Sequence, residues 1–393
     1  MLPLTLLLGL LAFGHSHSSL DRLSIASARS FREVAALNAL QATLPSLPVH
    51  LDASFTLSAS LLPTARSASG LVPVTVAWSS PSPAERDAIA LHCTGDPLTV
   101  GDYFNLTGAS GSFPVPLVHG TGCRFEFRYI QGGLGTAAAR VTAITPAPAL
   151  GADSDPVGTR LSYGDAAGDV LLTFASLTNS SAAPGYVSVG LAPGGPYAQH
   201  FATAPPTTYH PQDLCHAPAN TSSITSYIFP GYFHTATLRL SPGTRYYAIY
   251  GHAGSPPAPE TTFVTRSLPT PGQPTRFAAF ADSALYPVFP GTVTTIDNIN
   301  ALDSDEGPID FVTVTGDLGY SEGSTVLWAM WAAFLYPVSS RIPTLVTVGV
   351  SAVPSLPHSS QRPTQRPAHC PSLTPRSPPP STHTQPHINT IPK

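Results

Sequence analysis

The segments Arg276–Asp282 (RFAAFAD) and Ile309–Tyr320 (IDFVTVTGDLGY) decide the fold of this chain, because each is a short apolar run that leads into an aspartate. Such runs are typical of strands buried in a parallel sheet. An aspartate at the carboxyl end of such a strand lies at the sheet edge where open α/β proteins bind ligands. Asp282 and Asp317 are therefore candidate metal ligands, and two carboxylates placed in this way indicate a dinuclear site.

Strand and helix patterns alternate through the whole of segment 275–349. Apolar spacing predicts helices near 292–302 and 324–336, and Thr344–Val348 has the pattern of a third strand. This order predicts an α/β domain with a parallel sheet. Along the second helix, the helical spacing of three aromatic residues predicts that they pack in the core: Trp328, Trp331 and Phe334.

A sheet of only three strands has a structural weakness. It leaves an unpaired edge and an apolar face without a cover. We therefore expect the 275–349 segment to be less stable than the two segments before it, 51–145 and 154–267, and prone to aggregate.

Two segments before this one, 51–145 and 154–267, consist of short alternating runs separated by Pro, Gly and Ser. This pattern predicts two β-sandwich domains of the immunoglobulin or fibronectin type III kind. The runs that stand out as strands are 55–58, 72–78, 88–91 and 124–129 in the first domain, and 170–174, 186–189, 234–238 and 246–250 in the second.

The tail 350–393 is rich in Pro, Ser and Thr and has no acidic or aromatic residue, so we expect it to be disordered. The fold class is therefore multidomain: two β-sandwiches, a partial α/β domain and a disordered tail.

The amino terminus has the features of a secreted protein. Residues 1–14 are apolar, rich in leucine and end in Ala-Phe-Gly, as in a signal peptide, and they are too few to span a bilayer. A buried amino terminus is the alternative. Residues 20–44 have helical spacing and form a pro-segment or linker. Three N-x-[ST] sequons are candidate glycosylation sites: Asn105, Asn179 and Asn220.

Charge and cysteine content exclude some classes of function. The 18 Lys and Arg residues against 22 Asp and Glu give a net charge of −4, without the basic patch of a nucleic-acid-binding protein. The four cysteines lack the spacing of zinc sites. Cys93 and Cys123 form either a disulfide, in an oxidising compartment, or two buried thiols.

Three parts of the chain resemble the purple acid phosphatases of the metallophosphoesterase superfamily. Thr208–Cys215, Pro230–Ala236 and Leu240–Tyr247 resemble the fibronectin-like domain that precedes the catalytic domain in the large plant-type enzymes. Arg276–Asp282 is similar to the FxxxGDxG start of the catalytic domain, and Gly316–Tyr320 is similar to its GDxxY motif. The resemblance extends over 154–349, and the 51–145 sandwich looks like the extra amino-terminal domain of longer members.

The resemblance implies a site and an activity. Asp282 would bind Fe(III), Asp317 would bridge two metals, and Tyr320 would bind the iron as phenolate. The second metal would be zinc, manganese or iron(II). The family is that of acid phosphatases, hydrolases that cleave phosphate monoesters with a metal-activated hydroxide.

The chain departs from the family motifs in two places. Ala281 and Ala284 stand where the first motif has glycines, and Val350–Ala352 stands where the family has the Asn and His of a GNH motif. Three later histidine ligands have no counterpart. Of the family's ligands, only Asp282, Asp317 and Tyr320 remain, and no catalytic residue is retained.

We therefore expect a chain truncated at its carboxyl end and inactive, because of an isoform, an unspliced transcript or an error in the gene model. The alternative is a non-catalytic secreted binding protein that uses its β-sandwiches.

Overall fold

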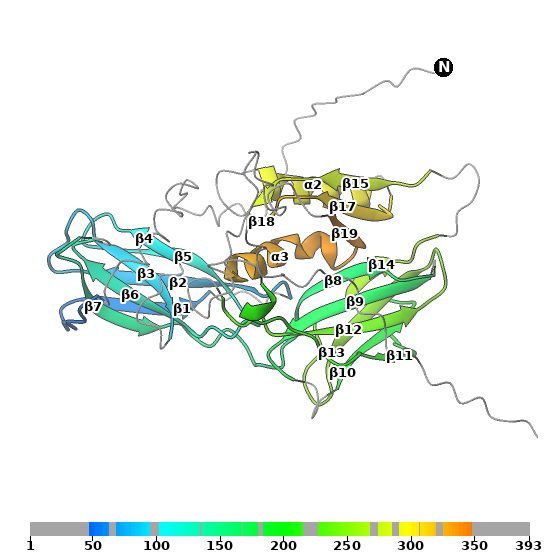
Figure 1. Cartoon of the computed structure of the whole chain (residues 1–393), viewed down its shortest axis with the longest axis horizontal. Coiled ribbons are helices and arrows are strands. Elements are labelled where there is room, and N and C mark those ends of the chain that lie inside the picture. Colours follow the sequence, from blue (N-terminus) through cyan, green and yellow to red (C-terminus); the bar gives the residue numbers. More distant parts are fainter. Residues whose placement is uncertain are drawn as a thin grey trace, which may run out of the picture. The chain divides into compact units, whose positions relative to one another are not determined.

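The computed structural model describes residues 47–62, 68–94, 102–133, 136–166, 168–179, 184–214, 227–267, 274–284, 291–305, 307–319 and 325–347 (Figure 1). The predicted signal peptide 1–14, the 20–44 segment and the 350–393 tail lie outside these residues, as do Cys215, Asn220, Tyr320 and Cys370. The described part is mostly β, in agreement with the sequence patterns. None of its helices is both long and apolar enough to cross a membrane.

Seven antiparallel strands form two sheets around one core between residues 56 and 146. One sheet has the order β1-β2-β5 and the other the order β4-β3-β6-β7. The bounds are β1 Thr56–Leu61, β2 Leu71–Ser79, β3 Ala88–Cys93, β4 Asp102–Asn105, β5 Ser110–Val118, β6 Phe125–Gln131 and β7 Arg140–Pro146. Alternate residues point inward, so Val74 and Val76 of β2 face Phe127 of β6 in the same core.

A disulfide and a buried carboxylate tie this sandwich together. Cys93 of β3 and Cys123 form a disulfide with a Cα–Cα distance of 5.3 Å, which decides between the two alternatives that the sequence leaves open. The buried Asp87 carboxylate accepts hydrogen bonds from the Tyr129 hydroxyl at 2.7 Å and from the Gly132 N–H at 2.9 Å. A buried carboxylate is stable only with such donors. Burial, followed by the neighbouring Asp87, raises the pKa of Tyr129.

A second set of strands forms another pair of antiparallel sheets, of order β11-β10-β13-β14 and β12-β9-β8. The bounds are β8 Val157–Tyr163, β9 Asp169–Ser176, β10 Gly185–Gly190, β11 Gln199–Ala202, β12 Tyr232–Arg239, β13 Arg245–His252 and β14 Thr261–Val264, with a short helical turn at Pro211–Asp213. Their shared core includes Leu172, Phe174, Val187 and Tyr250.

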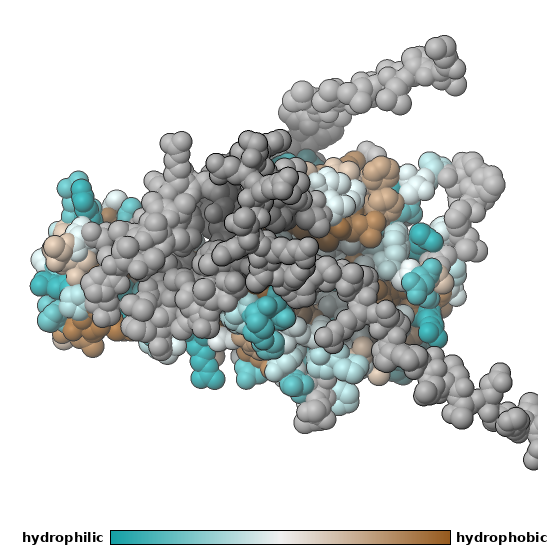
Figure 2. Space-filling model, in the orientation of Figure 1, coloured by the Kyte–Doolittle hydropathy of each residue, from teal (hydrophilic) through white to brown (hydrophobic). Residues whose placement is uncertain are grey.

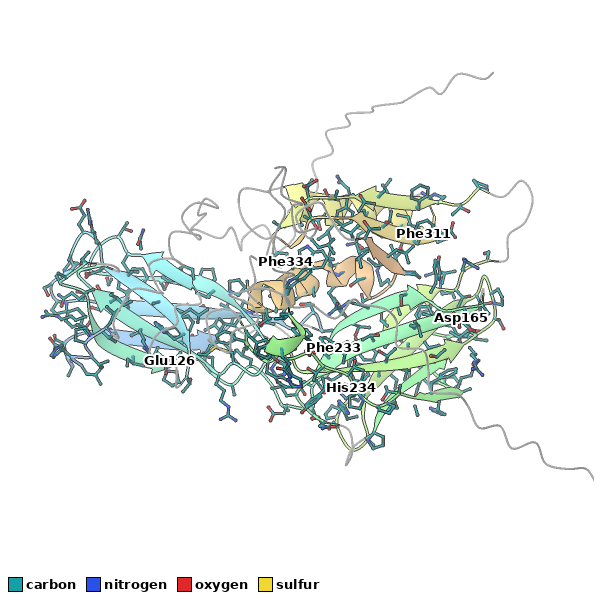
Figure 3. All side chains as sticks on the ribbon, in the orientation of Figure 1. Glu126, Asp165, Phe233, His234, Phe311 and Phe334 are labelled. Atoms are coloured by element: carbon teal, nitrogen blue, oxygen red, sulfur yellow. A yellow bond between two sulfur atoms is a disulfide. The ribbon has the colours of Figure 1, made fainter. Side chains whose placement is uncertain are left out.

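Two buried histidines share one serine hydroxyl in the second sandwich. Oγ of Ser176 lies 3.1 Å from Nε2 of His234 and 2.8 Å from Nε2 of His252, and all three residues are fully buried. Figure 3 labels His234 in this sandwich. The His234 ring stacks on Phe174 at 5.0 Å. Burial and then the neighbouring His252 lower the pKa of His234 to about 4.

The segment 275–347 contains the parallel strands and both helices that its sequence predicts. A sheet of order β15-β17-β19 lies beside a smaller parallel pair, β16-β18. The bounds are β15 Phe277–Phe280, β16 Ser283–Ala284, α2 Gly291–Asp305, β17 Phe311–Thr315, β18 Leu318–Gly319, α3 Thr325–Ser339 and β19 Thr344–Thr347. The core includes Ile296 of α2, Val312 of β17 and Leu335 of α3.

Helix α3 corrects two details of the sequence prediction. It continues to Ser339, so that Pro337 lies inside its last turn instead of ending it. Of the aromatic residues expected in the core, Trp331 is 4% exposed, whereas Trp328 is 37% exposed. The two tryptophans lie on neighbouring turns of one face, and Trp328, nearer the start of the helix, lies at the border of the buried stripe.

The other face of the parallel sheet is apolar and partly open. Phe277 is 58% exposed and stacks on Phe311 at 5.2 Å, with nearly parallel rings. On the edge strand β19, Leu345 and Val346 are also exposed. Hydrophobic surface is visible in this part of the molecule in Figure 2. Within the described residues, the apolar face that the sequence predicts is therefore present and only partly covered, since Tyr163 packs on Phe311.

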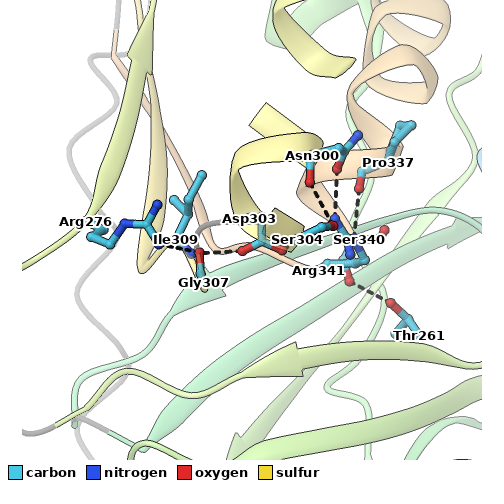
Figure 4. A network of polar contacts seen from close by, with 10 residues as sticks. All are labelled: Thr261, Arg276, Asn300, Asp303, Ser304, Gly307, Ile309, Pro337, Ser340 and Arg341. Carbon is cyan, nitrogen blue, oxygen red and sulfur yellow. Dashed lines mark hydrogen bonds and ion pairs between the residues drawn. The ribbon is translucent and has the colours of Figure 1, made fainter. Parts of the chain in front are cut away.

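Polar contacts join this segment to the second sandwich (Figure 4). The Thr261 hydroxyl donates to the Ser340 carbonyl at 2.8 Å, and the Tyr163 hydroxyl donates to the Asp310 carbonyl. After α3, Arg341 donates to Asn300 Oδ1 at 2.9 Å and lies 3.5 Å from the Asp303 carboxylate. The first two contacts join the segment to the second sandwich, and the contacts of Arg341 join the end of α2 to the turn before β19.

Candidate metal-binding site

Asp282 and Asp317 lie side by side at the carboxyl ends of two neighbouring parallel strands, as predicted from the sequence. Asp282 stands between β15 and β16, and Asp317 stands between β17 and β18. The N–H of Asp282 donates to the carbonyl of Gly316 at 3.4 Å, so the two turns are in direct contact. The chain therefore brings two carboxylate-bearing turns to one edge of the sheet.

The two turns differ by one residue. Phe280 pairs with Val314 in the larger sheet, and Ser283 pairs with Leu318 in the smaller one. Between these paired positions the first turn has two residues, 281 and 282, whereas the second has three, 315 to 317, the first of which is the last residue of β17. Because the extra residue comes before Asp317, both aspartates occupy the position just before the β16-β18 pair.

Both aspartates have a left-handed backbone conformation. The φ angle is +52° at Asp282 and +46° at Asp317, and these are the only positive φ values at non-glycine positions in the described part of the chain. Aspartate and asparagine tolerate this region better than other L-residues, but at a cost of about 1 kcal/mol or more. Strained backbone of this kind collects at functional sites, so the two residues stay a candidate site.

The replaced glycines affect only the first turn. In the second turn, Gly316 and Gly319 have φ angles of +97° and +69°, conformations that glycine adopts without strain. In the first turn, Ala281 and Ala284 do not have positive φ, and Ala284 is 2% exposed. The two turns thus reach the same aspartate conformation with different flanking backbone.

Trp331, which the sequence assigns only to the core, contacts both aspartate turns. The indole N–H of Trp331 donates to Oγ of Ser283 at 3.1 Å. A Cβ atom on Gly319 would lie 3.3 Å from Cγ of the same indole. The Thr292 hydroxyl accepts from the Ala284 N–H at 3.1 Å. Helical spacing identifies Trp331 as buried, but it gives no sign of this polar contact.

In the two aspartate turns, the acidic side chains among the described residues are those of Asp282 and Asp317. Asp282 is exposed and Asp317 is half-buried. Carboxylate oxygens suit hard cations such as Mg²⁺, Mn²⁺ or Fe(III). Within the described ranges, no group of three or more His, Cys, Asp or Glu side chains could hold a metal. These residues therefore do not fit a dinuclear centre, whereas the two carboxylates can contribute to binding one cation.

A groove and the predicted glycosylation sites lie away from the two aspartate turns. A groove of about 340 Å³ begins at Arg276 and runs between β15 and α2, and neither aspartate lines it. Two of the predicted glycosylation sites, Asn105 at the end of β4 and Asn179 after β9, are exposed. Tyr320 and Asn220 are outside the described residues.

Comparison with known proteins gives related sequences and a related fold. No protein-family model matches the chain. "Probable inactive purple acid phosphatase 1" of Arabidopsis thaliana is 26% identical over 315 residues, which are 70% of this chain and 50% of the relative. "Probable inactive purple acid phosphatase 27" of the same plant is 31% identical over 156 residues, which are 36% of this chain and 24% of the relative.

A solved structure shares the fold. The purple acid phosphatase from yellow lupin (Lupinus luteus) seeds superimposes with a TM-score of 0.60 at 22% identity, over 76% of this chain and 57% of the lupin protein. This chain spans half or less of the length of the two Arabidopsis relatives.

Proposed function

Because this chain is related to the purple acid phosphatases, we propose that it is a phosphatase-type protein that binds one hard metal cation and does not hydrolyse phosphate monoesters. One observation carries this proposal: Asp282 and Asp317 occupy adjacent turns at the carboxyl edge of a parallel sheet, both with positive φ. A carboxylate pair held at the cost of backbone strain is expected where a ligand repays that cost.

The two aspartates would have distinct tasks. Asp317 is less exposed and lies on the central strand side of the site, since β17 pairs with both β15 and β19. It would anchor the cation, and the exposed Asp282 would close over it from the edge strand. Tyr320, three residues after Asp317, is the candidate third ligand. A bound cation would polarise a phosphate oxygen and lower the pKa of a bound water.

The expected lack of hydrolysis rests on the ligand set and on the relatives. The described residues supply two carboxylates where a dinuclear centre needs further nitrogen and oxygen donors. Val350–Ala352 replaces the Asn and His of the family's GNH motif. Both Arabidopsis relatives carry the word inactive in their names. In its active form the family hydrolyses phosphate monoesters with Fe(III) and a divalent metal, zinc, manganese or iron.

Secretion and N-glycosylation belong to the same proposal. Asn105 and Asn179 are exposed, so both are accessible to a glycan. Expression in an animal or plant cell should place the chain in the medium, with a mass that falls after treatment with an N-glycosidase. Retention of the full chain in the cytosol without a change in mass would contradict secretion.

A direct test uses the full chain, secreted and purified. Hydrolysis of p-nitrophenyl phosphate at pH 5 is measured together with bound metal and the visible spectrum, with Asp317→Asn as the control. One bound cation per chain, lost in the variant, without turnover in either protein would support the proposal. Turnover that disappears in Asp317→Asn would overturn the expected inactivity.

A lack of both metal and turnover would overturn the cation site. It would favour the second candidate, a secreted binding protein that uses its two β-sandwiches. Each of those has a complete buried core of its own, independent of the aspartates.

A further inference from the structure

We propose that Trp331 is a positioning residue that holds the two aspartate turns in register. This inference rests on the proposed cation site and assigns the side chain that shapes it. Trp331 belongs to α3, not to either turn, and it touches the residue after Asp282 and the residue two after Asp317.

The indole contacts each turn in a different way. Its N–H donates to Oγ of Ser283 at 3.1 Å, and both residues are buried, with 4% of Trp331 and 2% of Ser283 exposed. On the other turn, the ring packs close to Gly319, since a Cβ there would lie 3.3 Å from the indole Cγ, closer than an ordinary van der Waals contact. The rigid indole thus fixes the position of both turns relative to α3.

The turns need such a support because their own pairing is short. The β16-β18 pair consists of two residue pairs, Ser283 with Leu318 and Ala284 with Gly319. Two aspartates in the left-handed region and a long hydrogen bond of 3.4 Å between Asp282 N–H and Gly316 add little stability. Without the indole, the distance between the two carboxylates would vary, and a cation that needs both would bind less well.

A simple core role makes a different prediction. Trp331 also packs with Leu335 and Val338 in the core of this segment. If packing were its whole task, removal of the hydrogen bond with the ring in place would change stability and leave cation affinity unaltered.

The test is a double-mutant cycle on the full chain. Ser283→Ala removes the acceptor and keeps the indole in place, Trp331→Phe removes the N–H donor, and the double variant removes both. Trp328→Phe is the matched control, because this tryptophan lies one turn away on α3, is 37% exposed and meets Trp331 edge-on at 5.3 Å. Mn²⁺ affinity is measured by calorimetric titration.

We expect each single variant to bind Mn²⁺ about tenfold more weakly, as for the loss of one buried hydrogen bond. The double variant should bind no more weakly than Trp331→Phe alone, and Trp328→Phe should bind within twofold of the wild type. Affinities of both single variants within twofold of the wild type would overturn the proposal.

Hydrogen exchange in the presence of a chelator separates this inference from the cation site. The amide of Asp282 joins the two turns, so its exchange should be about tenfold faster in Ser283→Ala and Trp331→Phe, and unchanged in Trp328→Phe. If the wild type does not bind Mn²⁺ but this pattern is found, the cation site fails and the positioning role stands. If the amide of Asp282 exchanges equally fast in all the variants, the positioning role fails.

Discussion

The left-handed aspartates predict an unusual order of stability among substitutions at one position. At ordinary negative φ, replacing alanine by glycine destabilises a protein by about 0.5–1 kcal/mol, because glycine gains entropy in the unfolded chain. At φ +46°, alanine itself is strained by about 1–2 kcal/mol, and glycine is not. We therefore expect Asp317→Gly to be about 1 kcal/mol more stable than Asp317→Ala, a reversal of the usual order.

The other variants complete the series. Asp317→Asn keeps the tolerance for positive φ and should lie within about 0.5 kcal/mol of the wild type when a chelator is present. Asp282, at φ +52°, should give the same order. Asp165 is the control, because it is exposed and its φ is not positive, so that Asp165→Ala should be at least as stable as Asp165→Gly.

The assay is urea unfolding followed by tryptophan fluorescence, with and without Mn²⁺. At a cation concentration of 100 times Kd, the wild type should gain about 2.7 kcal/mol, and the Gly and Ala variants of Asp317 should gain none. The reasoning is refuted if Asp317→Ala proves as stable as Asp317→Gly in the chelator. That result would mean that the turn does not hold this residue in the left-handed region.

Further predictions concern the sandwiches and the open sheet face. Because burial lowers the pKa of His234 to about 4, the native state keeps this ring neutral while the unfolded chain binds a proton below about pH 6.5. The contribution of His234 to the free energy of unfolding is therefore fully present above pH 6.5 and falls by up to about 3 kcal/mol as the pH drops to 4. His234→Gln should reduce this dependence on pH in unfolding experiments at several pH values. Replacing Cys93 and Cys123 by serine opens a loop with a sequence separation of 30 and should cost about 3–4 kcal/mol in urea unfolding, a loss that a reductant should reproduce in the wild type. Phe277→Lys should lower self-association in light scattering, whereas Leu191→Lys, at another exposed apolar position, should not; equal effects would contradict a role for the sheet face.

The sequence predicts central strands well and edge strands poorly. The runs that it identifies in the two sandwiches correspond to β1, β2, β3, β6, β9, β10, β12 and β13. The strands that it does not identify are β4, β5, β7, β8, β11 and β14, and each of these lies at the edge of its sheet. A strand with one neighbour packs less apolar surface, so its sequence has a weaker alternating pattern.

At the candidate site, the sequence predicts where the two aspartates lie and not which residues support their turns. Asp282 and Asp317 can be found because each follows an apolar run. The positive φ angles, the extra residue before Asp317 and the contact of Trp331 with Ser283 depend on the register between distant segments. Local spacing contains no information about that register, so these features appear only in three dimensions.

The hydroxyl groups that connect the second sandwich to the α/β segment limit which other domains could replace that sandwich. Thr261 donates to the carbonyl of Ser340, a residue that is 3% exposed, and Tyr163 donates to the carbonyl of Asp310. A foreign domain that covered the same surface without matching hydroxyls would leave these carbonyls unpaired, at about 1–3 kcal/mol each. Joining the α/β segment to a foreign domain between residues 267 and 275 would therefore yield a less stable hybrid.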